Sequence, residues 1–178
     1  MTPRNRPQTQ VLLNTERFQV VRHRHTLADG REFVRETIQH PGAAVILPLL
    51  DDGRVCLLRN YRVAVDETLI ELPAGTLEEG ELPIATAARE LAEETGYAAA
   101  RIEPLAEMLM SPGILNERMH VFLATGLTTG TAALEAGEEI ETFVVAWDEA
   151  LALVDDGRIK DAKTIAALLL YDRRLRST

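Results

Sequence analysis

The sequence has little cysteine, few aromatic residues and a deficit of basic side chains. Cys56 is its one cysteine, which excludes an internal disulfide. With 19 Lys and Arg against 28 Asp and Glu, the net charge is −9, so we expect no role in binding nucleic acid or a membrane surface. Aromatic residues make up 4% of the chain, and its four histidines lack cysteine partners at zinc spacing, so no zinc site is expected.

Long apolar runs are also missing. No run approaches the roughly 18 residues that a membrane-spanning helix needs. Residues 1–10 are polar and include two prolines, unlike the apolar centre of a secretory signal. We therefore expect a cytoplasmic protein. Its 178 residues suit one domain with a small appendage.

The first half of the chain has the pattern of strands and turns. Segment 16–39 alternates around Ala28-Asp29-Gly30, which predicts a hairpin, and no regular structure is expected before it. The apolar runs 43–50 and 54–61, joined by Asp51-Asp52-Gly53, predict a second hairpin. A short strand over 68–72 follows.

A helix is predicted over 82–95, with Pro83 in its first turn and Gly96 at its end. It has an apolar side, opposite its acids, formed by Ile84, Ala87, Ala88 and Leu91. Further strands are expected over 101–110, 118–124 and 140–147, and further helices over 148–154 and 161–175, the last an apolar core helix. The pattern predicts an α/β fold with a mixed sheet and helices on both sides.

Three carboxylates of the predicted helix lie on one face. Glu90, Glu93 and Glu94 are separated by three and four positions, so like charges crowd together. A cation among them relieves the repulsion, and carboxylate oxygens select Mg²⁺ or Mn²⁺. An isolated Glu-x-x-Glu-Glu is more often a solvated helix face, so the surrounding spacing decides between the two interpretations.

That spacing extends from Gly75 to Gly96 and reads Gly-x5-Glu-x7-Arg-Glu-Leu-x-Glu-Glu-x-Gly. It resembles the Nudix box, and the chain is therefore similar to Nudix hydrolases, which cut nucleoside diphosphates linked to another moiety. Tyr97 stands where the family prefers an aliphatic residue. The resemblance implies a Nudix α/β/α sandwich over 41–178. It also implies a small antiparallel sheet over 1–40, by which ADP-ribose-hydrolysing members form homodimers.

The resemblance assigns roles to the residues of the box. Glu81 is expected to be structural and Arg89 to orient a neighbouring carboxylate, with Glu93 as its partner one turn on. Metal ligands are expected from the carbonyl of Ala74 and from Glu90, Glu94 and, directly or through water, Glu93.

A general base is expected outside the box, because a carboxylate engaged with metal takes protons poorly. The acidic segment 135–141 precedes a predicted strand and resembles the loop that carries a catalytic or metal-binding glutamate in ADP-ribose-hydrolysing members. Alignment on Ile140-Glu141 places Glu138 at that position, with Glu139 as the alternative. An ordinary solvated turn would have the same composition.

Two features resemble the ADP-ribose pyrophosphatase-like subgroup. Pro112 follows Tyr97 by fifteen residues, as in that subgroup. Asn60-Tyr61-Arg62 followed by Glu71-Leu72-Pro73-Ala74-Gly75 resembles its Gln-Tyr-Arg and Glu-x-Pro-Ala-Gly, with Asn60 replacing Gln. Substrate contacts are therefore expected from Arg62, Glu71 and Pro112. Arg62 alone would otherwise be a surface arginine at a strand end.

The resulting hypothesis is Mg²⁺-dependent hydrolysis of ADP-ribose to AMP and ribose 5-phosphate. Adenine would stack on Phe18, Phe33 or Tyr61, or on a residue of a second subunit. Other nucleoside-diphosphate sugars, notably GDP-mannose, are the nearest alternative substrates. NADH and dinucleoside polyphosphates are further alternatives. A Nudix-fold sensor that binds a nucleotide without cleaving it is the alternative of another class.

Overall fold

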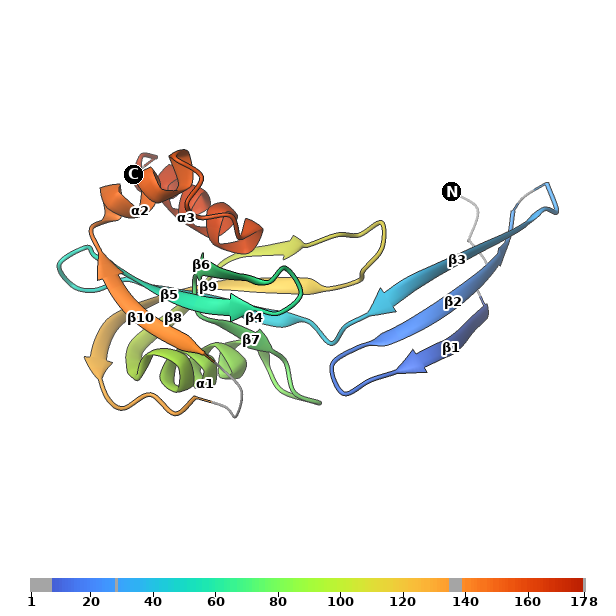
Figure 1. Ribbon diagram of the computed structural model, residues 1–178, viewed down its shortest axis with the longest axis horizontal. Coiled ribbons are helices and arrows are strands. Elements are labelled where there is room, and N and C mark those ends of the chain that lie inside the picture. The colour runs from blue at the N-terminus through green and yellow to red at the C-terminus, as the bar shows by residue number, and fades with distance from the viewer. Residues whose placement is uncertain (1–7, 28, 135–138, 178) are drawn as a thin grey trace. The chain divides into compact units, whose positions relative to one another are not determined.

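A computed structural model describes residues 8–27, 29–134 and 139–177, and the chain forms two units (Figure 1). The first unit comprises Met1–Gly42 and Leu109–Arg118, and the second Ala43–Met108 and Met119–Thr178. Each unit is described by itself.

The first unit contains a three-stranded antiparallel sheet in the order β1 (Gln8–Asn14), β2 (Gln19–Thr26) and β3 (Glu32–Gln39). The hairpin predicted within 16–39 is confirmed, with Gln19 opposite Gln39 and Thr26 opposite Glu32. The expectation of no regular structure before residue 16 is wrong from Gln8 onwards, because β1 pairs along β2. Its hydrogen bonds come from a neighbouring strand, which local composition does not reveal.

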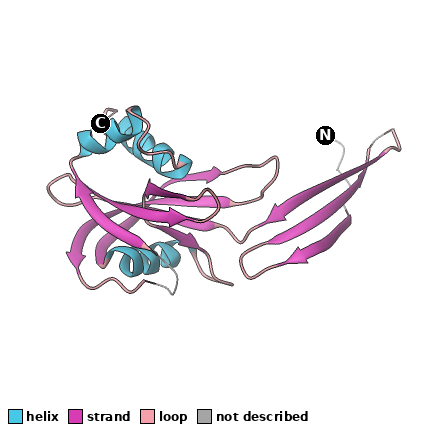
Figure 2. Ribbon diagram, viewed as in Figure 1, coloured by secondary structure: helices cyan, strands magenta, loops and turns pink. Residues whose placement is uncertain are grey.

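The second unit has helices on both sides of its strands (Figure 2). In Figure 1, α1 lies on one side, and α2 and α3 on the other. The elements are β4 (Ala43–Pro48), β5 (Val55–Arg62), β6 (Glu67–Glu71), β7 (Ala74–Thr76), α1 (Pro83–Thr95), β8 (Tyr97–Leu109), β9 (Arg118–Thr129), β10 (Ile140–Val145), α2 (Trp147–Asp155) and α3 (Ala162–Leu175).

These strands form two sheets, ordered β7-β4-β9-β8 and β10-β5-β6. Strand β4 runs parallel to β9 and antiparallel to β7, so the first sheet is mixed, as the pattern predicts. The second hairpin, predicted over 43–61, is wrong. A turn forms at 51–53, but β4 and β5 enter different sheets and meet at the Leu49–Val55 bridge. Both strands are rich in buried residues, so distant partners decide where each one pairs.

Three tight turns share the sequence Asp-Gly-Arg, at residues 29–31, 52–54 and 156–158. In each, the aspartate accepts hydrogen bonds from the backbone N–H and Nε of the arginine, at 2.7–3.2 Å. Each glycine has a positive φ and donates its N–H to the carbonyl three residues earlier. Hydrogen bonds from the arginines lower the pKa of Asp52 and Asp156. The same side chains therefore close a turn in both units.

The core beneath α1 joins the helix to β4 and β9 through Ala44, Ile46, Ala87, Leu91, Phe122 and Ala124. The buried face of α1 differs from the predicted one. Ile84 and Ala88 are exposed, whereas Glu90 and Glu94 are buried on the same face as Ala87 and Leu91. Acids opposite an apolar stripe were expected because composition favours burying the apolar residues. The structure instead turns two carboxylates inward.

Two further expectations concern the membrane and the cysteine. None of the helices in the described ranges is long and apolar enough to cross a membrane. Cys56 is buried in β5, and burial raises the pKa of its thiol to about 12. A thiol in such a place is inert packing.

Candidate metal and diphosphate site

Helix α1 begins and ends where its sequence predicts. Pro83 occupies the first turn, and Gly96 is the left-handed C-cap, whose N–H donates to the carbonyl of Ala92 at 2.9 Å. This fixes Glu90 and Glu94 one turn apart on the buried face, where they are 9% and 4% exposed. Two buried carboxylates so close together require partners.

Strand β7 supplies the surface against which these carboxylates lie. Glu94 Oε2 accepts a hydrogen bond from the N–H of Ala74 at 2.9 Å. A Cβ on Gly75 would lie 1.8 Å from Glu90 Oε1, so any side chain there would displace the carboxylate. The structure thus brings Glu90, Glu94 and the Ala74–Gly75 backbone together, and their role as metal ligands stays a prediction.

Arg89 binds the remaining acids of the box. Its Nη1 donates to Glu90 Oε1 at 2.7 Å and to Glu93 Oε2 at 2.9 Å, so the predicted pair with Glu93 is present. Its Nε and Nη2 donate to the two oxygens of Glu81, each at 3.1 Å. These hydrogen bonds lower the pKa of Glu81 to about 2 and raise that of Arg89. Glu81 therefore anchors the arginine that orients Glu90 and Glu93.

The composition of this cluster fits a divalent cation. Three carboxylates, Glu81, Glu90 and Glu93, share Arg89 as a cation, and a fourth, Glu94, accepts from the N–H of Ala74. All its donors to a metal are oxygens, which suits hard cations such as Mg²⁺. Within the part of the chain that the structure describes, no three His, Cys, Asp or Glu side chains already converge as a metal cluster. Glu90 is instead held by Arg89, while Glu94 accepts from Ala74.

Arg62 and Glu71, both expected at the substrate, form a pair with each other. The Nε and Nη2 atoms of Arg62 donate to the two oxygens of Glu71 at 2.8 and 2.7 Å. Burial alone would raise the pKa of Glu71, but the bonds from Arg62 and the nearby Lys163 lower it. The side chain of Arg62 is 40% exposed and that of Glu71 2%. The arginine is thus oriented by a buried carboxylate and open to solvent.

The remaining predicted site residues are Glu138, Glu139 and Pro112. Glu138 falls outside the described residues, and Glu139 is exposed directly before β10. The Tyr61 hydroxyl donates to Asp66 at 2.7 Å, and this bond, burial and the charge of Glu139 raise the pKa of Tyr61. Ile140 pairs with Asn60, so Glu139 directly precedes the strand that lies beside β5. Pro112 belongs to the first unit, in the segment Leu109–Arg118.

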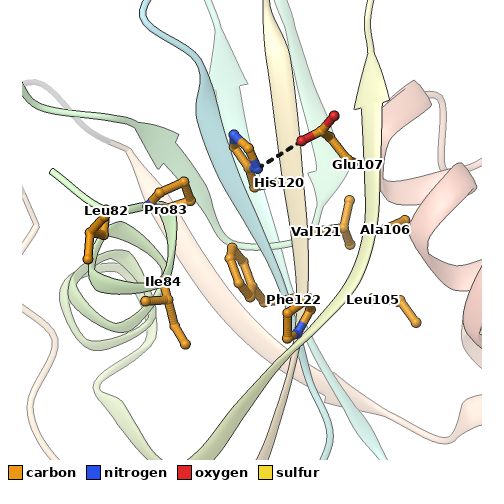
Figure 3. Close-up of a pocket in the computed structure, with 10 residues that line it drawn as sticks. Leu82, Pro83, Ile84, Leu105, Ala106, Glu107, His120, Val121 and Phe122 are labelled. Atoms are coloured by element: carbon orange, nitrogen blue, oxygen red, sulfur yellow. Dashed lines mark ion pairs between the residues drawn. The ribbon is translucent and has the colours of Figure 1, made fainter. Parts of the chain in front are cut away.

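A separate pocket of about 570 Å³ lies between the start of α1 and strands β8 and β9 (Figure 3). Its lining is mostly apolar, with Leu82, Ile84 and Phe122 among its walls. The Glu107–His120 pair, at 3.6 Å, is at one end. None of the box glutamates lines it. An apolar pocket with a paired charge offers nothing to a diphosphate, so the carboxylate cluster is the better site.

Comparison with known proteins identifies the family to which this chain belongs. The family model for the NUDIX domain matches residues 39–168, which include both the box and the strands around it. The chain belongs to the Nudix family. A Nudix chain is expected to use divalent metals, which members of the family generally do.

The relatives of this Nudix protein include an ADP-ribose pyrophosphatase of Bacillus subtilis, 39% identical over 80% of this chain and 78% of the relative. A methanol dehydrogenase activator of Bacillus methanolicus is 36% identical with the same coverage. A GDP-mannose pyrophosphatase of Cronobacter sakazakii is 37% identical over 89% and 81%. A solved ADP compounds hydrolase superposes with a TM-score of 0.84 at 22% identity, covering 99% of this chain and 98% of that one, which confirms the fold.

The sequence pattern missed a set of polar residues at the start of α3. Lys163 and Thr164 are buried, and Asp161 caps the helix by accepting from the N–H of Thr164 at 3.0 Å. The available signal was Asp161 ahead of an apolar run, because aspartate is strongly preferred at helix N-caps. The alanine and leucine run of helix 161–175 was expected to be core, and this is confirmed for Ala167 and Leu168 but wrong for Leu169 and Leu170, which are 46% and 41% exposed because they lie on the outer face of the helix.

Proposed function

We propose that this Nudix protein hydrolyses the diphosphate bridge of ADP-ribose, with Mg²⁺ and alternatively Mn²⁺ as cofactor. Water adds to one phosphorus atom, the P–O–P bond breaks, and AMP and ribose 5-phosphate leave. The observation that carries the proposal is the convergence of Glu90 and Glu94 on the Ala74–Gly75 backbone. The 39% identity to an ADP-ribose pyrophosphatase supports the substrate.

The residues have distinct roles in this proposal. Glu90, Glu94 and the carbonyl of Ala74 hold the metal, with Glu93 directly or through water. A bound divalent ion neutralises the diphosphate oxygens and acidifies a water. Arg89 orients Glu90 and Glu93, to which it donates hydrogen bonds. Arg62, fixed by Glu71, offers its partly exposed side chain to a phosphate, and Pro112 contributes to substrate recognition.

Glu138 accepts the proton of the attacking water in this proposal, with Glu139 as the alternative. Glu138→Gln is expected to lower kcat by about 10²-fold or more, the range of general-base catalysis, with little change in metal affinity. Steady-state kinetics at several Mg²⁺ concentrations measure both quantities. Should Glu139→Gln alone lower kcat, the assignment moves by one residue.

The deciding experiment incubates the protein with Mg²⁺ and ADP-ribose, GDP-mannose, NADH or diadenosine polyphosphates, and identifies products by chromatography. AMP release from ADP-ribose is expected, abolished by EDTA. Glu94→Gln should reduce kcat at least about 10²-fold, equivalent to about 3 kcal/mol of transition-state stabilisation. A glutamine oxygen still accepts from the N–H of Ala74, so the fold should persist.

Glu79→Gln is the matched control, because Glu79 is an exposed glutamate of the same box. Dominant turnover of GDP-mannose would transfer the assignment to the alternative substrate, which the GDP-mannose pyrophosphatase relatives favour. Tight ADP-ribose binding without turnover of any substrate would instead identify a sensor.

We propose further that residues 1–40 are a dimerisation element beside the Nudix domain at 41–178. Apolar side chains of β1 and β3 support this, since Val11, Leu13 and Val34 are 51%, 53% and 43% exposed within the described residues. A cytoplasmic location is part of the same proposal. It is supported by Cys56, a buried free thiol of the kind that reducing compartments maintain.

A further inference from the structure

A buried polar cluster lies where α3 meets the end of β6. Lys163 is 7% exposed, Thr164 is fully buried, and Glu71, the last residue of β6, is 1% exposed. An apolar core helix needs none of these groups. Buried polar side chains are costly unless they are hydrogen-bonded, so their partners indicate what they hold.

Thr164 holds the backbone directly ahead of the metal segment. Its Oγ1 accepts a hydrogen bond from the N–H of Leu72 at 2.8 Å and donates to Asp161 Oδ2 at 2.5 Å. Both functions of the hydroxyl are used, so its orientation is fixed. Leu72 is two residues before Ala74, and β6 has already ended at Glu71. A helix side chain thus satisfies an amide beyond the end of that strand.

Lys163 holds the residue before Leu72. Its Nζ lies 2.5 Å from Glu71 Oε2 and 3.0 Å from Asp161 Oδ2. Glu71 also receives the two hydrogen bonds from Arg62. Two cations therefore fix one buried carboxylate, and a rotation of Glu71 would break bonds to both β5 and α3.

The segment between Glu71 and Gly75 is consequently held from two helices. Helix α3 holds Glu71 and Leu72 through Lys163 and Thr164, and α1 holds Ala74 through Glu94. Residues that orient ligands from outside the ligand set commonly change metal affinity about 10- to 100-fold when they are lost.

We propose that the first turn of α3 is a positioning device for the metal site, in which Thr164 and Lys163 fix the carbonyl of Ala74 relative to Glu90 and Glu94. This inference rests on the metal site of the proposed function. Thr164 and Lys163 are not among the assigned metal ligands, so both are positioning residues.

Thr164→Val tests the hydroxyl, because valine has nearly the same shape and cannot accept from Leu72. Mn²⁺ binding without substrate, followed by electron paramagnetic resonance, is expected to weaken about tenfold or more. The Mg²⁺ concentration for half-maximal hydrolysis should rise in parallel. Thr164→Ser retains the hydroxyl and should bind Mn²⁺ within about twofold of wild type, as the rescuing variant.

Lys163→Met tests the charge, with Lys160→Met as its matched control. Both lysines bind glutamates of β6, Lys160 to Glu67 at 2.5 Å and Lys163 to Glu71 at 2.5 Å. The Lys160–Glu67 pair is exposed at the far end of the strand, with side chains 61% and 49% accessible. Lys163→Met is expected to weaken Mn²⁺ binding several-fold, and Lys160→Met to leave it unchanged.

The outcomes separate this inference from the proposed function. Thr164→Val and Lys163→Met with wild-type Mn²⁺ binding would overturn the positioning role while leaving the metal site intact, even if both melt at lower temperature. Wild-type protein that binds no Mn²⁺ would overturn both proposals together. If Thr164→Val fails to fold, the Lys163 and Lys160 variants decide the question alone.

Discussion

At the scale of single residues, the contact between Gly75 and Glu90 leaves no room for a methyl group. The Cβ of an alanine would lie 1.9 Å from the carboxyl carbon of Glu90. Gly75→Ala is therefore expected to displace the carboxylate of Glu90 and abolish hydrolysis, and to lower the free energy of unfolding by only about 1 kcal/mol, the low end for overpacking, because the displaced atoms are the end of a flexible side chain. Urea denaturation and metal titration measure the two effects.

Gly113→Ala is the control for that substitution, since a Cβ there meets nothing within 4 Å. It should leave both activity and the urea midpoint near wild type. A Gly75→Ala protein with normal metal binding would show that Glu90 has freedom to move, and its assignment as a ligand would then lose its main support.

The pair between Glu81 and Arg89 makes stability depend on pH. Hydrogen bonds from Arg89 lower the pKa of Glu81 from 4.5 to about 2 in the folded protein. The stabilisation is therefore complete above pH 4.5 and is lost as the pH falls toward 2. Glu81→Gln should be less stable than wild type at pH 7, and the difference should shrink between pH 4.5 and 2.

Urea denaturation in metal-free buffer at pH 7, 4.5, 3.5 and 2.5 measures this difference. The exposed Glu79→Gln variant provides the comparison, with an expected difference from wild type close to zero throughout. A constant gap between wild type and Glu81→Gln across this range would mean that Arg89 does not perturb Glu81.

At the scale of elements, helix α1 was predictable and the pairing of β4 and β5 was not. The limits of α1 depend on Pro83 and Gly96, whose effects are local. A turn at 51–53 was also predictable, but sheet membership depends on β9 and β10, which follow much later in the chain. Strand pairing is a long-range property, and a short-range pattern assigned the nearest partner.

The same distinction applies to the candidate site. The resemblance to the Nudix box located Glu90 and Glu94, because helix periodicity and box spacing are sequence properties. Their inward orientation could not be deduced from polarity, which favours exposing acids. The roles of Lys163 and Thr164 could not be predicted from the sequence. Their partners, Glu71 and Leu72, lie about ninety residues earlier, and only the packing of α3 brings them into contact.

At the scale of the whole molecule, the exposed apolar side chains of β1 predict self-association. Leu13 is 53% exposed and Val11 51%. Placing a charge among them should oppose their burial against a second copy. Wild type is expected to sediment as a dimer and Leu13→Asp as a monomer at the same micromolar concentration.

Gln10→Asp adds the same charge at an exposed polar position of β1 and should leave the dimer intact. Analytical ultracentrifugation over a range of concentrations distinguishes the species. A monomeric wild type would remove the assigned role of residues 1–40, without affecting the assignment of the metal site.

The three Asp-Gly-Arg turns have a consequence for chemical ageing. In Asp-Gly sequences the glycine nitrogen can attack the protonated aspartyl carboxyl group with loss of water, and hydrolysis of the resulting succinimide gives isoaspartate. Here each glycine N–H is donated to a carbonyl, and each carboxylate is held by an arginine. In the folded protein, the glycine nitrogen and the aspartyl carboxyl group of each turn are therefore both held by hydrogen bonds and are not free to react. Isoaspartate should therefore accumulate in stored protein only as fast as these turns open. The amount of isoaspartate formed would be a measure of how often the turns unfold.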